Sequence, residues 1–172
     1  MGHNVPIVDG LAPVSEAIAN GGLWWPRPYA EAQLLIEMCG NGIELMHDGY
    51  QRATRVKNHC RRIVPAENGL AVTDSFLGHG TANVAFCWHF GRGFDRFDSL
   101  SMTARGADGE VRLSFDGVPT APEVLFLSGE APGGWFSTSY GEADPTVAIS
   151  LSWRLELPAE VTTRFALMAC AE

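Results

Sequence analysis

Hydrophobic and polar positions alternate most regularly in residues 147–157, which read VAISLSWRLEL. Successive side chains of a β-strand point to opposite faces, so this alternation predicts a long strand with one face in a core and one toward solvent. The apolar face would carry Val147, Ile149, Leu151, Trp153, Leu155 and Leu157, and the other face Ala148, Ser150, Ser152, Arg154 and Glu156.

Similar short strand patterns recur along the chain, separated by turn residues. Only Val14–Ala19 suggests a helical turn, which Asn20-Gly21-Gly22 would stop. The pattern predicts an all-β protein, a two-sheet antiparallel β-sandwich of roughly a dozen strands. Gly106 and Asp108-Gly109 predict a hairpin turn. The predicted strands are Val5–Val8, Glu31–Met38, Ile43–His47, Val56–Val64, Leu70–Asp74, Ala82–Phe90, Ser99–Ala104, Glu110–Phe115, Val124–Ser128, Trp135–Ser139, Val147–Leu157 and Val161–Ala169.

Composition agrees with a folded globular domain. The chain has 172 residues, 46% hydrophobic and 19% charged, which is enough for one domain with a real core. No internal repeat or long linker divides it, so residues 1–172 are predicted to be a single domain. No apolar run approaches the roughly 20 residues of a membrane span, and we expect neither a membrane nor a nucleic-acid partner.

Positive charge is concentrated in one stretch, residues 47–90, although the whole chain has net charge −8. This stretch holds four of the five histidines, and five of the twelve Lys and Arg residues lie between Arg52 and Arg62. Such a local reversal of sign suggests an anionic ligand. On a strand, Lys57, His59 and Arg61 would share one face, with next neighbours roughly 7 Å apart. The opposite face would carry Val56, Cys60 and Val64, and Arg62 would interrupt it near a strand end or edge. A solvated strand face explains the same spacing.

Several segments of this sequence resemble a known family. HDGYQR, NHCRRIV, GLAVTDSFLG and VAFCWHFG are similar to parts of the C-terminal β-sandwich of heparinase II/III-like polysaccharide lyases, as are HNVPIVDG and the segment from GGWFSTSYGEADP to TTRFAL. The resemblance covers nearly the whole chain, and only residues 95–127 add little to it. It implies a longer parent protein, periplasmic or secreted, that cleaves an acidic, uronate-containing polysaccharide such as a glycosaminoglycan by β-elimination. Because HNVPIVDG lies well inside such parents, we expect the chain to be a fragment that lacks their N-terminal helical toroid.

Lyase chemistry needs a cation or strong donor for the uronate carboxylate, and a base and an acid near the sugar. Tyr50, His59 and Arg61 have suitable side chains, but the sequence does not show that they converge. The resemblance implies that the main base and acid come from the toroid, while the sandwich forms one wall of the cleft. Packing or domain contact therefore explains Tyr50 and His59 equally well, and the fragment alone should be inactive. Lys57, His59, Arg61 and His89 are the candidate substrate-binding residues.

The resemblance also places a metal-ligand histidine at His3, with a further His and Asp upstream of this chain. Zinc needs about three protein ligands, so the parent is expected to hold zinc and this chain none tightly. A lone terminal histidine without any role is the other reading.

The remaining candidates carry weaker signals. His79 is expected in a solvated loop, and His89 either shares a polar face with His59 or has a structural role. Asp48 and Asp74 resemble a glycosidase pair only if their separation fits, and Trp24-Trp25-Pro26 suits either sugar stacking or burial. Cys39, Cys60, Cys87 and Cys170 have no zinc spacing and are expected to be buried free thiols. The rival function is a stand-alone carbohydrate-binding or structural sandwich without catalysis.

Overall fold

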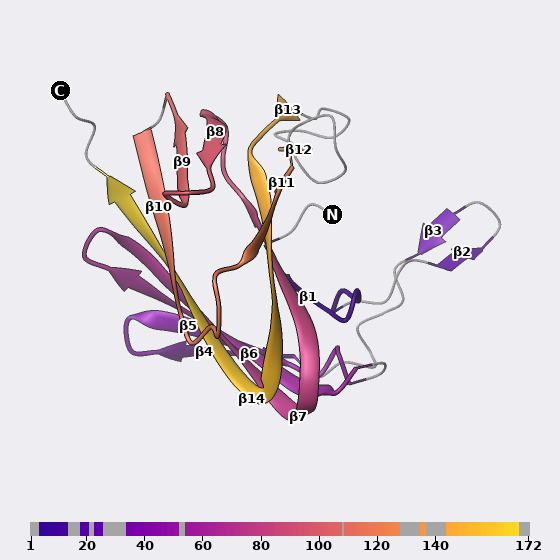
Figure 1. Cartoon of the computed structure of the whole chain (residues 1–172). Helices are drawn as coiled ribbons and strands as arrows, with labels where there is room; N and C mark the ends of the chain where they lie inside the picture. Colours follow the sequence, from indigo (N-terminus) through magenta and orange to yellow (C-terminus); the bar gives the residue numbers. More distant parts are fainter. Residues whose placement is uncertain are drawn as a thin grey trace.

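The computed structural model confirms an all-β, antiparallel fold (Figure 1). It describes residues 4–13, 18–20, 23–25, 34–51, 54–107, 109–127, 135–136 and 144–168. None of these described elements is a helix long and apolar enough to cross a membrane. The strands are β1 (Pro6–Val8), β2 (Ile18–Asn20), β3 (Leu23–Trp25), β4 (Leu34–Cys39), β5 (Gly42–His47), β6 (Val56–Ala66), β7 (Gly69–His89), β8 (Phe94–Asp98), β9 (Thr103–Gly106), β10 (Gly109–Asp116), β11 (Glu123–Leu127), β12 (Trp135–Phe136), β13 (Asp144–Pro145) and β14 (Ala148–Met168).

Two long strands, β7 and β14, join the elements into one sheet. The strand order is β4-β5-β6-β7-β14-β10-β9-β8, with β1 also paired to β7 and β11 also paired to β14. β2–β3 and β12–β13 are separate two-stranded ribbons. The prediction of separate strands at 70–74 and 82–90, and at 147–157 and 161–169, was therefore wrong. In each case the turn residues between them bend a strand without ending it.

The bend has a local cause in both strands. The β7–β14 register shifts between Leu157 and Ala159, so three residues of β7 lie opposite Pro158. Gly80 in this part of β7 has φ +77°, a conformation that glycine adopts readily. Such a bulge adds twist and turns the strand. Beyond it, each long strand enters the second layer (Figure 1).

The two layers pack face to face and enclose the core. Trp88, near the end of β7, lies 4.9 Å from Phe165, near the end of β14, measured between ring centroids. The ring centroids of Phe115 and Trp153 are 5.3 Å apart. All six apolar positions of the alternating segment 147–157 are buried, as predicted, whereas Ala148 on the opposite face is buried as well and not turned to solvent. Burial of each large apolar side chain stabilises the fold by about 1.5–3 kcal/mol.

Smaller predictions had mixed outcomes. Ile18–Asn20 form β2, so the end of the suggested helical turn was wrong, and residues 14–17 lie outside the described part. His79 is exposed as expected but belongs to β7 and not to a loop. Arg62 was expected near a strand end or edge, yet it lies mid-strand between Glu44 of β5 and Thr73 of β7. The hairpin between Gly106 and Gly109 is confirmed.

Candidate functional site

Three neighbouring strands bring a polar network into the interior of the sandwich. His47 ends β5, His59 and Arg61 belong to β6, and Asp74 belongs to β7. The strand register sets His47 opposite His59 and Arg61 opposite Asp74. His59 is 3% exposed, and Asp74 is fully buried.

A bulge in β6 changes the expected distribution of its side chains. The β6–β7 register shifts between Val56 and Asn58, which adds one residue at Lys57. Val56 and His59 are consequently both buried, whereas Lys57 is exposed. The prediction that Lys57 shares a face with His59 and Arg61, and that Val56 faces the other way, was wrong for this reason. Cys60 and Val64 are half-buried.

Asp74 is the centre of the network. Its Oδ1 accepts hydrogen bonds from His59 Nε2 and Arg61 Nε, both at 2.7 Å, and its Oδ2 accepts one from Arg61 Nη2 at 2.9 Å. Burial raises the pKa of the Asp74 carboxyl, but the His59 hydrogen bond and the Arg61 guanidinium outweigh it and lower the pKa. Asp74 is thus an ionised carboxylate whose oxygens are both already bonded, which argues against a glycosidase pair with Asp48.

The hydrogen bonds fix which ring nitrogens carry protons. The Gly49 backbone N–H donates to His47 Nδ1 at 3.1 Å, so this nitrogen is an acceptor. His47 Nε2–H then donates to His59 Nδ1 at 3.0 Å, and His59 Nε2–H donates to Asp74. Both rings are neutral in this arrangement. Burial and the nearby His59 lower the pKa of His47 from 6.5 to about 4.

Tyr50 packs against this network from the turn that follows β5. Its ring centroid is 5.3 Å from that of His47 and 5.8 Å from that of His59. The side chain is 1% exposed, and its hydroxyl donates to the Pro6 carbonyl oxygen at 2.5 Å. A catalytic role for Tyr50 or His59 stays a prediction, and it would require these buried side chains to leave their contacts.

Arg61 is the member of the network that reaches a cavity. Its side chain is 12% exposed, Nη1 donates to the Asn4 carbonyl oxygen, and the guanidinium carbon lies 5.2 Å from the centroid of the Trp88 ring. The cavity has a volume of about 640 Å³ and lies between the two layers. Its lining is mainly apolar and includes Ile63, Leu70, Val72, Val111, Phe165 and Leu167.

His89 does not join this network. It nevertheless lines the same cavity as Arg61, and both residues bond Asn4. The His89 backbone N–H donates to Asn4 Oδ1 at 2.8 Å and Nδ1–H donates to the same oxygen at 3.1 Å. Its Nε2 is buried and has no hydrogen-bond partner among the described residues.

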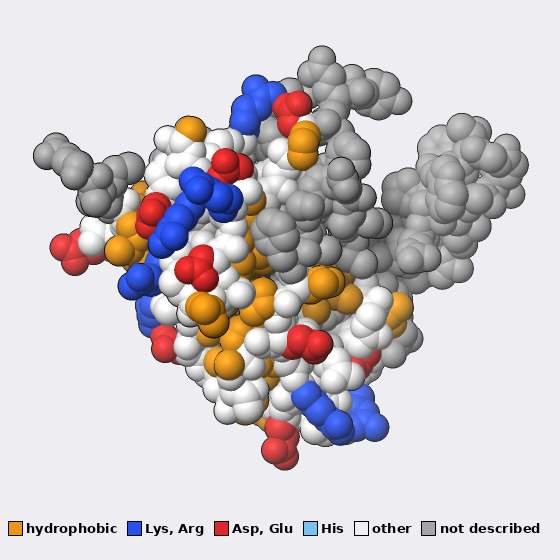
Figure 2. Space-filling view, turned by 45° about the horizontal axis from the view of Figure 1, so that its top comes forward, with side chains coloured by type: hydrophobic (Ala, Val, Ile, Leu, Met, Phe, Trp, Pro, Cys, Tyr) orange, Lys and Arg blue, Asp and Glu red, His pale blue; other side chains and the backbone are white. Residues whose placement is uncertain are grey.

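Among the described residues, neither charged side chains nor possible metal ligands form a second cluster besides the network around Asp74. On the face in Figure 2, basic and acidic side chains alternate around apolar patches and form no single cationic field. His3 lies outside the described residues. Within the described ranges, no three His, Cys, Asp or Glu side chains are grouped to hold a metal ion. The metal role of His3 therefore stays a prediction.

The remaining predicted positions are two tryptophans and four cysteines. Trp24 and Trp25 belong to the β2–β3 ribbon. Cys39, Cys60 and Cys87 are free and half-buried, while Cys170 lies outside the described part. Burial and the neighbouring Glu44 raise the pKa of the Cys60 thiol to about 11, so it is not a reactive thiolate.

Comparison with known proteins decides the family. The model of the family "Heparinase II/III-like, C-terminal" matches residues 2–164. The chain belongs to this family. A comparison of this heparinase II/III-like C-terminal domain with curated proteins found no match.

Solved structures share the fold of this heparinase II/III-like domain at low sequence identity. Heparinase III (BT4657 gene product) superposes with a TM-score of 0.61 at 16% identity, covering 96% of this chain and 24% of its own length. A mutant of heparan sulfate lyase HepC from Pedobacter heparinus gives 0.60 at 13% identity, with coverages of 98% and 25%. The 4-alpha-glucanotransferase from Thermococcus litoralis gives 0.54 at 18% identity, with coverages of 78% and 22%. The chain thus spans about a quarter of these proteins.

Proposed function

We propose that this chain is the C-terminal sandwich of a larger, periplasmic or secreted polysaccharide lyase that cleaves acidic polysaccharide by β-elimination. The observation that carries the proposal is the family match over residues 2–164. The heparinase III and heparan sulfate lyase structures that share the fold are about four times as long as this chain. In this proposal, the rest of the parent is a helical domain, and the present domain forms one wall of the cleft between them.

The geometry suggests which catalytic groups this domain supplies and which come from the rest of the parent protein. β-Elimination removes the proton beside the uronate carboxylate and expels the glycosidic oxygen, so it needs a base, an acid and a positive group at the carboxylate. Tyr50 and His59 are buried and bonded within the sandwich. We therefore assign the base and acid to the rest of the parent, and any zinc to a site completed there with His3.

Two positive side chains of this domain remain suited to contact an acidic sugar. Lys57 is exposed at the bulge of β6. Arg61 lines the cavity, and three of its five N–H groups are used by Asp74 and Asn4. Its other N–H groups can still donate to a ligand oxygen. Because Asp74 offsets the charge of Arg61, we expect it to orient the sugar, while Lys57 supplies the more available charge.

The test uses the isolated chain and the parent protein side by side, with a uronate polymer such as heparan sulfate. The isolated chain should bind weakly and release the polymer as salt rises, because screening at 0.1 M salt acts over about 10 Å. It should form none of the unsaturated uronate chromophore, since one wall cannot hold base, acid and carboxylate together. Robust product from the isolated chain would overturn the proposed division of labour.

Point variants of the parent test the two positive residues. Lys57→Ala and Arg61→Lys should lower kcat/KM, because each substitution weakens hydrogen-bond donation to the acidic sugar. Arg112→Ala, the exposed control, should leave kcat/KM unchanged. Circular dichroism must first show that each variant is folded. Equal effects of all three variants would remove Lys57 and Arg61 from the site. A folded parent that binds the polymer without cleaving it would point to a carbohydrate-binding module.

A further inference from the structure

Among the described strands, none pairs with the outer edge of β1, where Val8 alone forms a bridge, to Leu11. The Asp9 backbone N–H donates to the Asn83 carbonyl oxygen, and the register pairs Ile7 with Ala85. In an antiparallel ladder the hydrogen-bonded pairs alternate, so the carbonyl groups of Asn4 and Pro6 point away from β7. Pro6 has no N–H to satisfy, which suits a free edge.

Two side chains from the buried network replace the missing strand at this edge. The Tyr50 hydroxyl donates to the Pro6 carbonyl oxygen, and Arg61 Nη1 donates to the Asn4 carbonyl oxygen. Asp74 holds the Arg61 guanidinium by two bonds, and Tyr50 lies against both histidine rings. The position of β1 thus depends on groups that lie more than forty residues away in the sequence.

His47 and His59 link Gly49 to Asp74 through a series of hydrogen bonds, which we call the histidine chain. Each of these hydrogen bonds contains one proton. Three contacts run in series, from Gly49 to His47, from His47 to His59 and from His59 to Asp74. Each contact holds one N–H donor. An additional proton on any ring nitrogen, or on the Asp74 oxygen, sets two hydrogens against each other in one contact. Because Gly49 precedes Tyr50, a broken Gly49–His47 contact displaces the residue that holds Pro6.

We propose that this network is an acid-sensitive lock, which holds β1 against the sandwich at neutral pH and releases it when the histidine chain takes up a proton. This proposal stands apart from the proposed lyase function. The ionisable groups around His47 are Asp48, Tyr50, His59, Arg61 and Asp74. Burial, His59 and Arg61 oppose protonation, whereas Asp48 and Asp74 favour it. Because the pKa of His47 is lowered from 6.5 to about 4, the lock should lose stability as the pH falls from 6.5 toward 4.

The experiment is hydrogen exchange with mass spectrometry on the whole chain at pH 7.5, 5.5 and 4.0, expressed as protection factors. Peptides covering residues 4–13 report on β1, and peptides covering 109–116 report on β10. At pH 4.0 the wild-type β1 should lose at least about tenfold in protection, comparable to the loss of one or two hydrogen bonds, while β10 keeps its protection.

Two variants separate the lock from general unfolding. His47→Gln cannot take up the proton, so β1 should remain protected at pH 4.0. Tyr50→Phe removes one donor and should lower β1 protection about fivefold to tenfold at pH 7.5, with β10 unchanged. The proposal is overturned if wild-type β1 keeps its protection at pH 4.0, if β1 and β10 lose it together, or if either variant behaves like the wild type.

Discussion

At the scale of single residues, Asp74 has the greatest consequence for the fold. It is fully buried and ionised, and His59 and Arg61 are its partners on the next strand. Removing one member of a buried ion pair leaves the other charge without compensation in a low-dielectric interior. Asp116 makes a comparable bond to Arg164, but on the surface, where water already stabilises both charges.

This contrast gives a matched pair of variants. Asp74→Asn should lower the free energy of unfolding by about 3–5 kcal/mol, because the Arg61 charge stays buried. Asp116→Asn should lower it by at most about 1 kcal/mol. Urea denaturation at pH 7.5 measures both. Similar losses in the two variants would mean that Asp74 is not a stabilising centre.

The pH dependence of stability follows from His47. Its pKa is lowered from 6.5 to about 4 in the folded chain, so between these values the unfolded chain binds more protons. The contribution of His47 to the free energy of unfolding should therefore be complete above pH 6.5 and should decrease as the pH drops toward 4. His47→Gln should flatten this part of the curve, while the exposed control His79→Gln should not. An unchanged slope in His47→Gln would show that His47 is not the titrating group.

At the scale of elements, the bend of β7 depends on close approach of the backbone. A Cβ on Gly78 would lie 2.3 Å from the Arg55 carbonyl oxygen, a distance that real atoms do not tolerate. A Cβ on Gly91 would have no atom within 4 Å. The first glycine is thus required where β6 begins beside the bend, whereas the second is not.

Alanine substitutions test this requirement. Gly78→Ala should destabilise the chain by about 1–3 kcal/mol, because the backbone must shift to admit the methyl group. Gly91→Ala should change stability by no more than about 0.5 kcal/mol. Thermal unfolding followed by circular dichroism compares the two. Equal melting temperatures would show that the bend tolerates a side chain.

The sequence predicted the strands better than their partners. Alternation in 147–157 identified a buried face without any knowledge of neighbours, because the period of a strand is local. Asp74 was considered only as half of a glycosidase pair, and its pairing with His59 and Arg61 was missed because it depends on strand register, which local patterns do not give. One signal was present: a turn centred on Glu67 and Asn68, ahead of Gly69, pairs Arg61 with Asp74. The bulge at Lys57 and the contact of Asn4 with Arg61 had no comparable signal.

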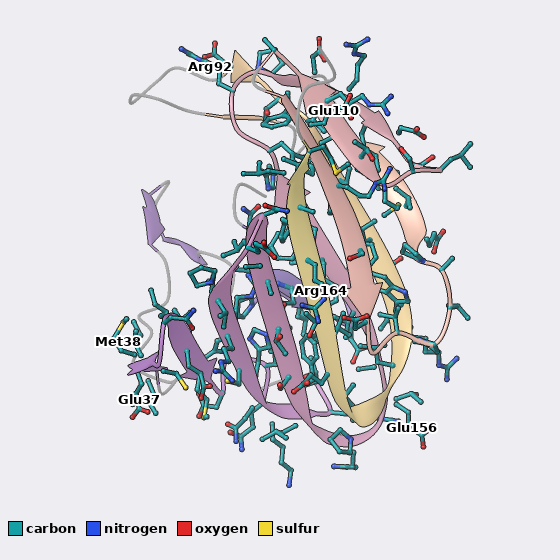
Figure 3. All side chains as sticks on the ribbon, turned by 90° about the vertical axis from the view of Figure 1, so that its left-hand side faces the viewer. Glu37, Met38, Arg92, Glu110, Glu156 and Arg164 are labelled. Atoms are coloured by element: carbon teal, nitrogen blue, oxygen red, sulfur yellow. The ribbon has the colours of Figure 1, made fainter. Side chains whose placement is uncertain are left out.

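At the scale of the whole molecule, the outer strand β4 is an exposed sheet edge. Ile36 and Met38 are 59% and 74% exposed, and Figure 3 shows Glu37 and Met38 projecting at the margin of the molecule. A sheet edge with exposed apolar side chains is prone to pair with other chains. Leu100 is also exposed, but it lies in a turn and offers no strand edge.

We therefore expect the isolated chain to self-associate through β4. Met38→Lys should reduce the fraction of oligomer in sedimentation velocity, because a charge opposes edge-to-edge pairing. Leu100→Lys, the matched control, should leave that fraction unchanged. Oligomer that responds equally to both substitutions would locate the contact elsewhere.

The two long strands also affect how the domain unfolds and folds. β7 and β14 contribute to both layers, so unfolding of either whole strand breaks hydrogen bonds in both layers. Their ladder joins Gly69 to Ala166 and Ala148 to His89, contacts between distant parts of the chain. Closing such long loops is slow, and folding must wait until residues near 166 are available. During synthesis, β4 to β7 would therefore emerge before β14, and the edge of β7 that pairs with β14 would be open to other chains until that strand is made.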